Sequence, residues 1–293
     1  MESTYHTLRG KPFHILTEGN PDHPKILFLH GFPEYSGAWA GISAQLSDQF
    51  FCIAPDQRGY GQSWREGTVT DYAARELAAD AAAFIDHFGG PMAVVGHDWG
   101  ASVAYALAIG RPDLVSRLVI ANGVHPVPFQ RELAKGGPQS EASGYIERLR
   151  MPKAHEKLAA DDFALMFAMF QAKMDTSWLT EAKKDGYRAA WRDAAGVNGM
   201  VNWYRATPLK VAKPGVPVPP DELPNWDPEA LRVRMPHLLL WGLGDRALLP
   251  ETRDGLADYC DDLAVEERDD ADHWIIHQHP DWVAENIREF LGG

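Results

Sequence analysis

The chain has 293 residues, of which 45% are hydrophobic and 24% are charged, a composition typical of a globular protein rather than a disordered one. Its formal charge of -13 at pH 7 argues against nucleic acid or an anionic membrane as a partner, because the Coulomb energy would be repulsive. The N-terminal residues do not resemble a signal peptide, and no apolar run approaches the roughly 18 residues that span a bilayer, so we expect a cytoplasmic protein.

Four short apolar runs in the first half of the chain predict strands that are buried on both faces, because apolar and polar residues do not alternate in them. They are residues 25–31, 50–56, 91–98 and 114–122. Two helical patterns lie between them, at residues 71–89, with Asp71 as the expected N-cap, and at residues 100–112. This alternation predicts an α/β fold with a mostly parallel central sheet flanked by helices.

The pattern changes after Asn122, where helical segments and a proline-rich stretch at residues 212–228 replace the apolar runs. Strand patterns return at residues 235–245 and 262–270, and residues 281–293 form an amphipathic closing helix. We therefore predict a core made of residues 1–125 and 229–293, with an inserted helical cap, or lid, over residues 126–228.

The sequence GHDWG, residues 96–100, follows a predicted buried strand and opens a predicted helix. A Gly-x-nucleophile-x-Gly pattern in this position is typical of a nucleophile elbow, whose glycines permit the sharp turn that lifts one side chain above the sheet. That side chain is Asp98. The alternative is that Asp98 only caps the helix that follows it.

An aspartate nucleophile implies a particular chemistry: it attacks saturated carbon and forms an alkyl ester, which activated water must then cleave. His273 is the candidate base. Asp245, just past a predicted strand, is the candidate partner of that base, because the order nucleophile, acid, histidine fits this fold. Asn122 occupies another position where an acid could stand, but it cannot carry the charge. A purely structural role for His273 stays open.

Three histidines close together in the sequence, His273, His277 and His279, raise the alternative of a zinc site. No metal motif such as H-E-x-x-H accompanies them, so we expect neither a metal nor another cofactor. Cys52 and Cys260 are the only cysteines, which excludes a disulfide framework.

Six motifs, in this order and spacing, resemble those of the α/β-hydrolase-fold epoxide hydrolases. They are HGFPE (residues 30–34), DQRGYGQS (56–63), GHDWG (96–100), NWYR (202–205), GLGD (242–245) and DHWIIHQHP (272–280). The resemblance extends from about Tyr5 to Phe290. It implies the α/β-hydrolase fold with an aspartate nucleophile and a catalytic triad.

The resemblance also implies two cap tyrosines that hold and protonate the epoxide oxygen. Tyr204 in NWYR is one, and Tyr145 is the other, although both could instead be packing residues. The oxyanion hole of the family corresponds here to the backbone N–H groups of Phe32 and Trp99.

The expected reaction converts an apolar epoxide and water to a vicinal diol, and the resemblance implies a role in detoxification. A homodimer is compatible with the sequence. The rival activities are haloalkane dehalogenation and fluoroacetate dehalogenation with the same nucleophile, and a non-catalytic binding protein of the same fold is the third alternative.

Several large apolar side chains of the cap follow helical spacing and are candidates either for lining the substrate pocket or for the core of the cap. They are Phe163, Met166, Phe167, Met169, Phe170 and Trp178.

Overall fold

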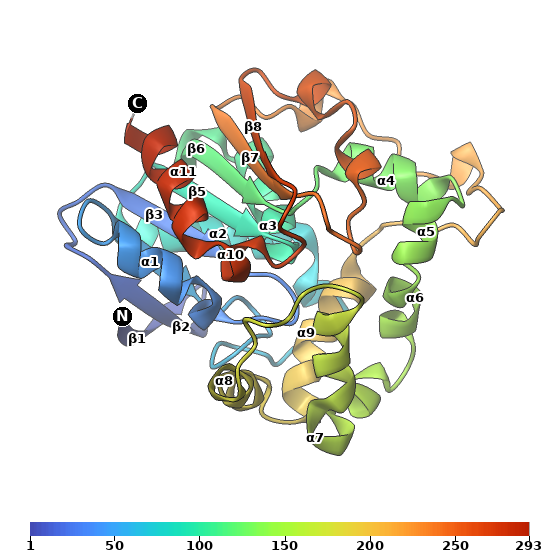
Figure 1. Cartoon of the computed structure of the whole chain (residues 1–293), viewed down its shortest axis with the longest axis horizontal. Coiled ribbons are helices and arrows are strands. Elements are labelled where there is room, and N and C mark those ends of the chain that lie inside the picture. Colours follow the sequence, from blue (N-terminus) through green and yellow to red (C-terminus); the bar gives the residue numbers. More distant parts are fainter. Residues whose placement is uncertain (293) are drawn as a thin grey trace.

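The computed structural model describes residues 1–292 and contains one eight-stranded sheet at its centre (Figure 1). The strand order is β1-β2-β4-β3-β5-β6-β7-β8. From β4 to β8 all neighbouring strands are parallel, while β1 and β2 pair antiparallel at one edge. The strands are β1 (Glu2–Leu8), β2 (Lys11–Glu18), β3 (Lys25–Leu29), β4 (Phe51–Pro55), β5 (Met92–His97), β6 (Val115–Ala121), β7 (His237–Gly242) and β8 (Leu263–Arg268).

The predicted α/β fold and all six predicted strands are confirmed. Every residue of β4, β5 and β7 is buried, which explains why these strands are continuous apolar runs. The sequence analysis missed β1 and β2. In β1 the side chains are exposed or half-buried at the sheet edge, so no apolar run identifies it.

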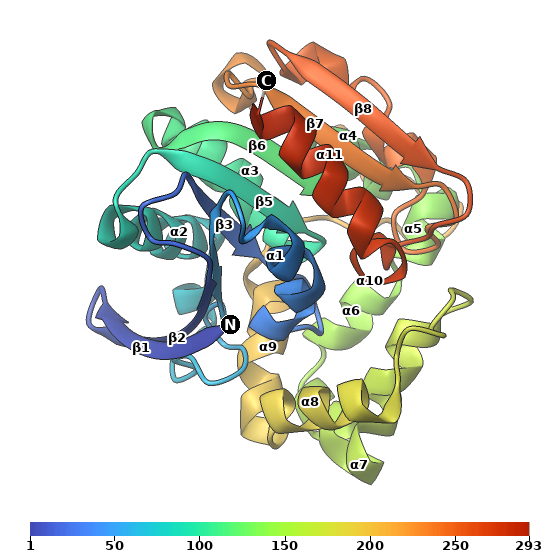
Figure 2. The same ribbon diagram turned by 60° about the vertical axis from the view of Figure 1, so that its left-hand side comes forward.

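Two layers of helices cover the sheet (Figure 2). On one face α2 and α3 pack together, and on the other face α1 packs against the C-terminal α11. The core helices are α1 (Ala40–Leu46), α2 (Ala74–Phe88), α3 (Trp99–Gly110), α10 (Ile275–Gln278) and α11 (Pro280–Gly292). Short 3-10 helices occur at Ser36–Trp39, Val69–Tyr72, Pro112–Leu114, Pro220–Glu222, Glu229–Leu231, Pro250–Arg253 and Leu256–Tyr259.

The α-helices between β6 and β7 gather at the end of the sheet where the parallel strands have their carboxyl ends (Figures 1 and 2). They are α4 (Pro126–Ala134), α5 (Pro138–Ala142), α6 (Tyr145–Arg150), α7 (Ala154–Gln171), α8 (Glu181–Trp191) and α9 (Ala194–Ala206). The division into a core and a cap at residues 126 and 228 stays a prediction. This arrangement matters for function, because ligands of parallel α/β sheets bind beyond the carboxyl ends of the strands.

The predicted start of the first helix, at Asp71, was wrong. Asp71 belongs to the 3-10 helix Val69–Tyr72, where its carboxylate and Thr68 form a capping box, and α2 begins three residues later at Ala74. Asp71 stabilises the preceding turn because the reciprocal bonds to Thr68 satisfy free N–H groups there.

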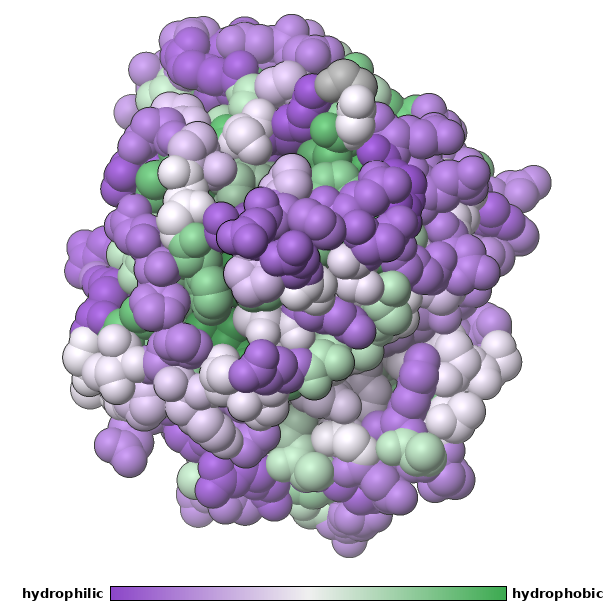
Figure 3. Space-filling model, turned by 90° about the vertical axis from the view of Figure 1, so that its left-hand side faces the viewer, coloured by the Kyte–Doolittle hydropathy of each residue, from purple (hydrophilic) through white to green (hydrophobic). Residues whose placement is uncertain are grey.

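The surface in Figure 3 is mostly hydrophilic, with apolar side chains in smaller areas, as for most globular proteins. Within residues 1–292, the helices are all too short or too polar to cross a membrane.

Candidate active site

Asp98 lies at the sharp turn between β5 and α3, with a φ of 49° and a ψ of -118°. A positive φ is unfavourable for a residue with a side chain, so the surrounding packing must hold the turn. The two flanking glycines permit that packing. A Cβ on Gly100 would lie 2.0 Å from the carbonyl oxygen of Leu29, and one on Gly96 would lie 2.7 Å from the carbonyl oxygen of Gly100. The predicted elbow geometry is therefore present.

The carboxylate of Asp98 faces a neighbouring loop of the core. Its Oδ1 atom accepts a hydrogen bond of 2.7 Å from the backbone N–H of Phe32. Burial raises the pKa of Asp98, and this effect exceeds the opposing influence of His273, His97 and the N–H groups of Phe32 and Trp99. The two backbone amides named in the sequence analysis are thus both directed at the Asp98 carboxylate.

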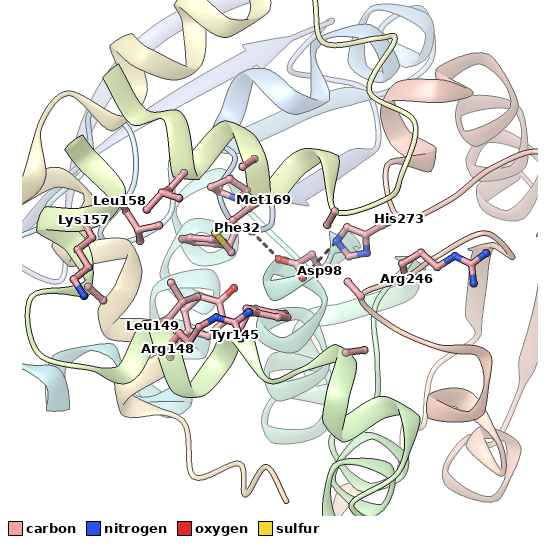
Figure 4. Close-up of a pocket in the computed structure, with 18 of the residues that line it drawn as sticks. Phe32, Asp98, Tyr145, Arg148, Leu149, Lys157, Leu158, Met169, Arg246 and His273 are labelled. Atoms are coloured by element: carbon pink, nitrogen blue, oxygen red, sulfur yellow. Dashed lines mark hydrogen bonds and ion pairs between the residues drawn. The ribbon is translucent and has the colours of Figure 1, made fainter. Parts of the chain in front are cut away.

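His273 stands between two carboxylates. Its Nδ1 atom is 2.8 Å from Oδ2 of Asp245, and its Nε2 atom is 3.6 Å from Oδ2 of Asp98. Burial alone would lower the pKa of His273, but the charges of Asp245 and Asp98 and the hydrogen bond that Nδ1 donates to Asp245 raise it to about 9. The structure thus brings together the three residues predicted for the triad, and Figure 4 shows two of them, Asp98 and His273, facing each other.

Asp245 is fully buried and held by several donors. Its Oδ1 atom accepts from the N–H groups of Ala247 at 2.8 Å and Leu248 at 2.9 Å, and its Oδ2 atom also accepts from Nδ2 of Asn122 at 2.8 Å. Burial would raise the pKa of this carboxyl, yet His273 and these donors lower it. Asn122 cannot serve as the acid because it is uncharged. Its side-chain amide instead orients Asp245, the acid that follows β7.

Tyr145, the first residue of α6, and Tyr204, in α9, face the same space above Asp98. Their ring centroids are 6.0 Å apart in an edge-to-face arrangement, and the Tyr204 ring also packs against Phe32 and Trp99. Burial raises the pKa of both phenols, and the negative charge of Asp98 raises it further. Both hydroxyls are therefore neutral at pH 7 and can donate a proton.

A cavity of about 650 Å³ joins these groups. Asp98, His273, Tyr145, Tyr204 and Phe32 all line it, and Figure 4 shows most of them converging on its interior. The rest of the wall is largely apolar and comes from α6, α7 and the loop after β7. It consists mainly of Leu149, Met151, Pro152, Ala154, Leu158, Leu165, Ala168, Met169, Ala172, Met174, Ala247 and Trp274.

Of the six large apolar side chains of the cap that were candidates for pocket lining, only Met169 lines this cavity among the described residues. Phe163, Met166 and Phe170 are buried in the hydrophobic core, while Phe167 and Trp178 pack against it. Helical spacing alone cannot separate these two roles, because both produce an apolar stripe.

The sequence analysis missed a buried cluster behind the triad, formed by Glu34, His97 and His277. The Glu34 carboxylate lies 2.8 Å from Nδ1 of His97 and 2.6 Å from Nε2 of His277, and Nε2 of His97 lies 2.8 Å from the carbonyl oxygen of His273. Burial would raise the pKa of Glu34, but the two histidines lower it well below its usual value. The motifs contained all three residues, but nothing in the sequence paired them.

The three histidines that raised the zinc alternative have separate partners. His273 contacts Asp245, His277 contacts Glu34, and Nε2 of His279 lies 3.2 Å from the carbonyl oxygen of Asp270. Each of the three imidazoles thus has a different polar partner.

Comparison with known proteins agrees with this geometry. The family model of the alpha/beta hydrolase fold matches residues 24–280. The AB hydrolase superfamily protein YfhM of Bacillus subtilis is 30% identical over 96% of this chain and 95% of its own length. Epoxide hydrolase 1 of Caenorhabditis elegans is 29% identical over 99% of this chain and 70% of its own length.

The solved structures show the same likeness. A structure described among novel epoxide hydrolases from metagenomes of hot environments is 36% identical, covers 100% of this chain and 99% of its own, and superposes with a TM-score of 0.90. With a family model that spans most of its length, this chain belongs to the α/β hydrolase fold family.

Proposed function

We propose that this protein hydrolyses an apolar epoxide to a vicinal diol through an alkyl ester on Asp98. The observation that carries the proposal is the shared cavity, in which a carboxylate on the elbow faces two neutral phenols and an imidazole. The named epoxide hydrolases among its relatives support the same reaction. An apolar wall suits a substrate body without charge next to the reacting ring.

In the first step, an oxygen of Asp98 attacks a ring carbon of the epoxide. The new bond between this oxygen and carbon forms as the ring C–O bond breaks, and the electron pair of that bond stays on the departing oxygen. Tyr145 and Tyr204 bind this oxygen and one of them transfers its proton to it, so that an alcohol rather than an alkoxide results. The raised pKa of both phenols keeps the protons available for this step.

In the second step, His273 takes a proton from water, which attacks the carbonyl carbon of the ester. The N–H groups of Phe32 and Trp99 stabilise the oxyanion, an effect of about 2.7–4 kcal/mol per donor in other enzymes. As the ester C–O bond to the carbonyl carbon breaks, His273 returns its proton to the leaving oxygen, and the diol departs with the oxygen that attacked the ring. The proton of the new carboxyl group passes to the phenolate left by the first step, so that Asp98 regains a carboxylate and the tyrosine its hydroxyl.

Ester formation in the first step removes the negative charge of Asp98, which affects the protonation of His273 in the second step. While Asp98 is ionised, it contributes to the raised pKa of His273, which is about 9. Ester formation removes that charge, so the pKa of His273 falls and more of the imidazole is in the neutral form, which can accept a proton.

Dehalogenation by the same nucleophile is the main rival. A halide leaves as an anion and needs hydrogen-bond donors but no proton, so two phenols that can transfer a proton suit an alkoxide better. The arginines that the resemblance to fluoroacetate dehalogenases would require after the nucleophile are absent, because Trp99, Gly100 and Ala101 stand there. A binding protein without turnover would not need the aligned Asp98, His273 and Asp245.

A panel of epoxides and chloroalkanes, assayed for diol and for halide together, tests the proposal. We expect diol from an apolar epoxide such as styrene oxide and no halide from simple chloroalkanes; halide release with inert styrene oxide would contradict it. Single turnover in ¹⁸O-water tests the nucleophile separately. The label should enter Asp98 rather than the first product, and the Asp98→Ala variant should make neither diol nor labelled protein.

A further inference from the structure

The wall of the active-site cavity carries three cations as well as its apolar side chains. Arg148, Lys157 and Arg246 line it, and all three are exposed at its margin. In residues 1–292 the same lining contains a single carboxylate, Asp98. This local balance is the reverse of that of the whole chain, which has 41 acidic and 28 basic residues.

None of the three cations is engaged by the protein. The side chains of Arg148, Lys157 and Arg246 make no hydrogen bond, ion pair or ring contact with any residue from 1 to 292. Most other arginines do: Arg150 next to Arg148, for example, binds Glu147 and three backbone carbonyls. An unpaired guanidinium beside an apolar cavity is available for an anionic ligand.

Arg148 and Lys157 share one part of the wall. Arg148 lies in α6, one turn after Tyr145, and Lys157 lies in the first turn of α7; the residues between them that line the cavity are Leu149, Met151, Pro152 and Ala154. Figure 4 shows Lys157 on the side of Tyr145 away from His273, and Arg148 beside Tyr145. The apolar lining thus extends from the reacting groups to two positive charges.

From this arrangement we infer that the substrate is an epoxide whose apolar body ends in an anionic group, such as a carboxylate, held by Arg148 and Lys157. The inference rests on the proposed epoxide hydrolysis and names the kind of substrate that this site takes. The charge of Asp98 repels the anionic end and the two cations attract it, so the substrate enters the cavity with its ring toward Asp98.

Because the cations are exposed, the contribution of each is modest and falls with salt. An exposed ion pair corresponds to about a two- to fivefold change in an equilibrium or rate ratio. Screening over about 10 Å at 0.1 M salt weakens it further. The inference therefore predicts a preference among epoxides and not an absolute requirement for charge.

The test compares epoxyundecanoate with its methyl ester, which has the same chain and epoxide but no charge. We expect kcat/KM to be higher for the acid at low salt, and the ratio of the two values to fall as sodium chloride is added. In the double variant Arg148→Gln, Lys157→Gln this ratio should fall by about two- to fivefold for each charge removed. The double variant Arg192→Gln, Lys210→Gln removes the same charge at exposed positions outside this cavity and should leave the ratio unchanged.

The outcomes separate the inference from the proposed function. Hydrolysis of the ester with no preference for the acid, or a preference that both double variants reduce equally, overturns the anionic substrate and leaves epoxide hydrolysis standing. Failure to hydrolyse either compound, or any neutral epoxide, contradicts both.

Discussion

The Nε2 atom of His273 lies 3.6 Å from Oδ2 of Asp98, while its Nδ1 atom is 2.8 Å from Oδ2 of Asp245. The two carboxylates thus occupy opposite nitrogens of one imidazole. With Asp245 bonded to Nδ1, the proton-accepting nitrogen is the one that faces Asp98 and the cavity. This orientation underlies the first two predictions.

Replacing His273 by Gln should stop the reaction at the ester, because no group in the site can then activate water. Incubation with an epoxide should increase the mass of the protein by that of one substrate, and peptide mapping should locate the addition at Asp98. The surface variant His87→Gln should turn over normally and show no lasting adduct. If His273→Gln acquires no mass although the native protein makes diol, Asp98 is not the nucleophile.

Stability should depend on the protonation of His273. Its pKa is about 9 in the folded protein and about 6.5 in an unfolded chain, so the folded state binds the proton more tightly. The resulting stability is fully present below about pH 6.5 and is lost as pH rises through about 9. Urea unfolding across this interval should show a falling free energy of unfolding, with a shallower fall in His273→Gln. An equal slope in both proteins would contradict the assigned pKa.

Removing one phenol should slow ring opening more than ester hydrolysis. We expect Tyr204→Phe to reduce the rate of alkylation about tenfold or more, since general acids contribute about 10²–10⁴-fold and Tyr145 remains to share the role. Stopped-flow tryptophan fluorescence can separate the two steps. Tyr5→Phe, at an exposed position of β1, is the control. An unchanged alkylation rate in Tyr204→Phe removes this residue from the acid role.

The buried carboxylate of Glu34 should contribute to stability through His97 and His277. Glu34→Gln loses the charge that both imidazoles face, and we expect the free energy of unfolding to drop by about 1–3 kcal/mol. Denaturant unfolding measures this change. The exposed Glu156→Gln should stay within about 0.5 kcal/mol of the native protein, and an equally small effect of Glu34→Gln would show that the cluster is not stabilising.

The sequence by itself determined the parallel strands and the elbow. Strands such as β5 are buried on both faces, so their composition alone identifies them, and the two glycines around Asp98 reveal the turn because no larger residue fits there. These signals are local, and local signals can be found without knowing what packs against them.

Tertiary structure alone decided which side chains meet. Glu34 and His277 are 243 positions apart, and nothing in the chain relates them until the loop after β3 and α10 come together. Likewise, only the packing of α7 distinguishes Met169, which lines the cavity, from Phe170, which is buried in the core. Both residues follow the same helical spacing, and their roles differ because the neighbouring elements leave space beside one and fill it beside the other.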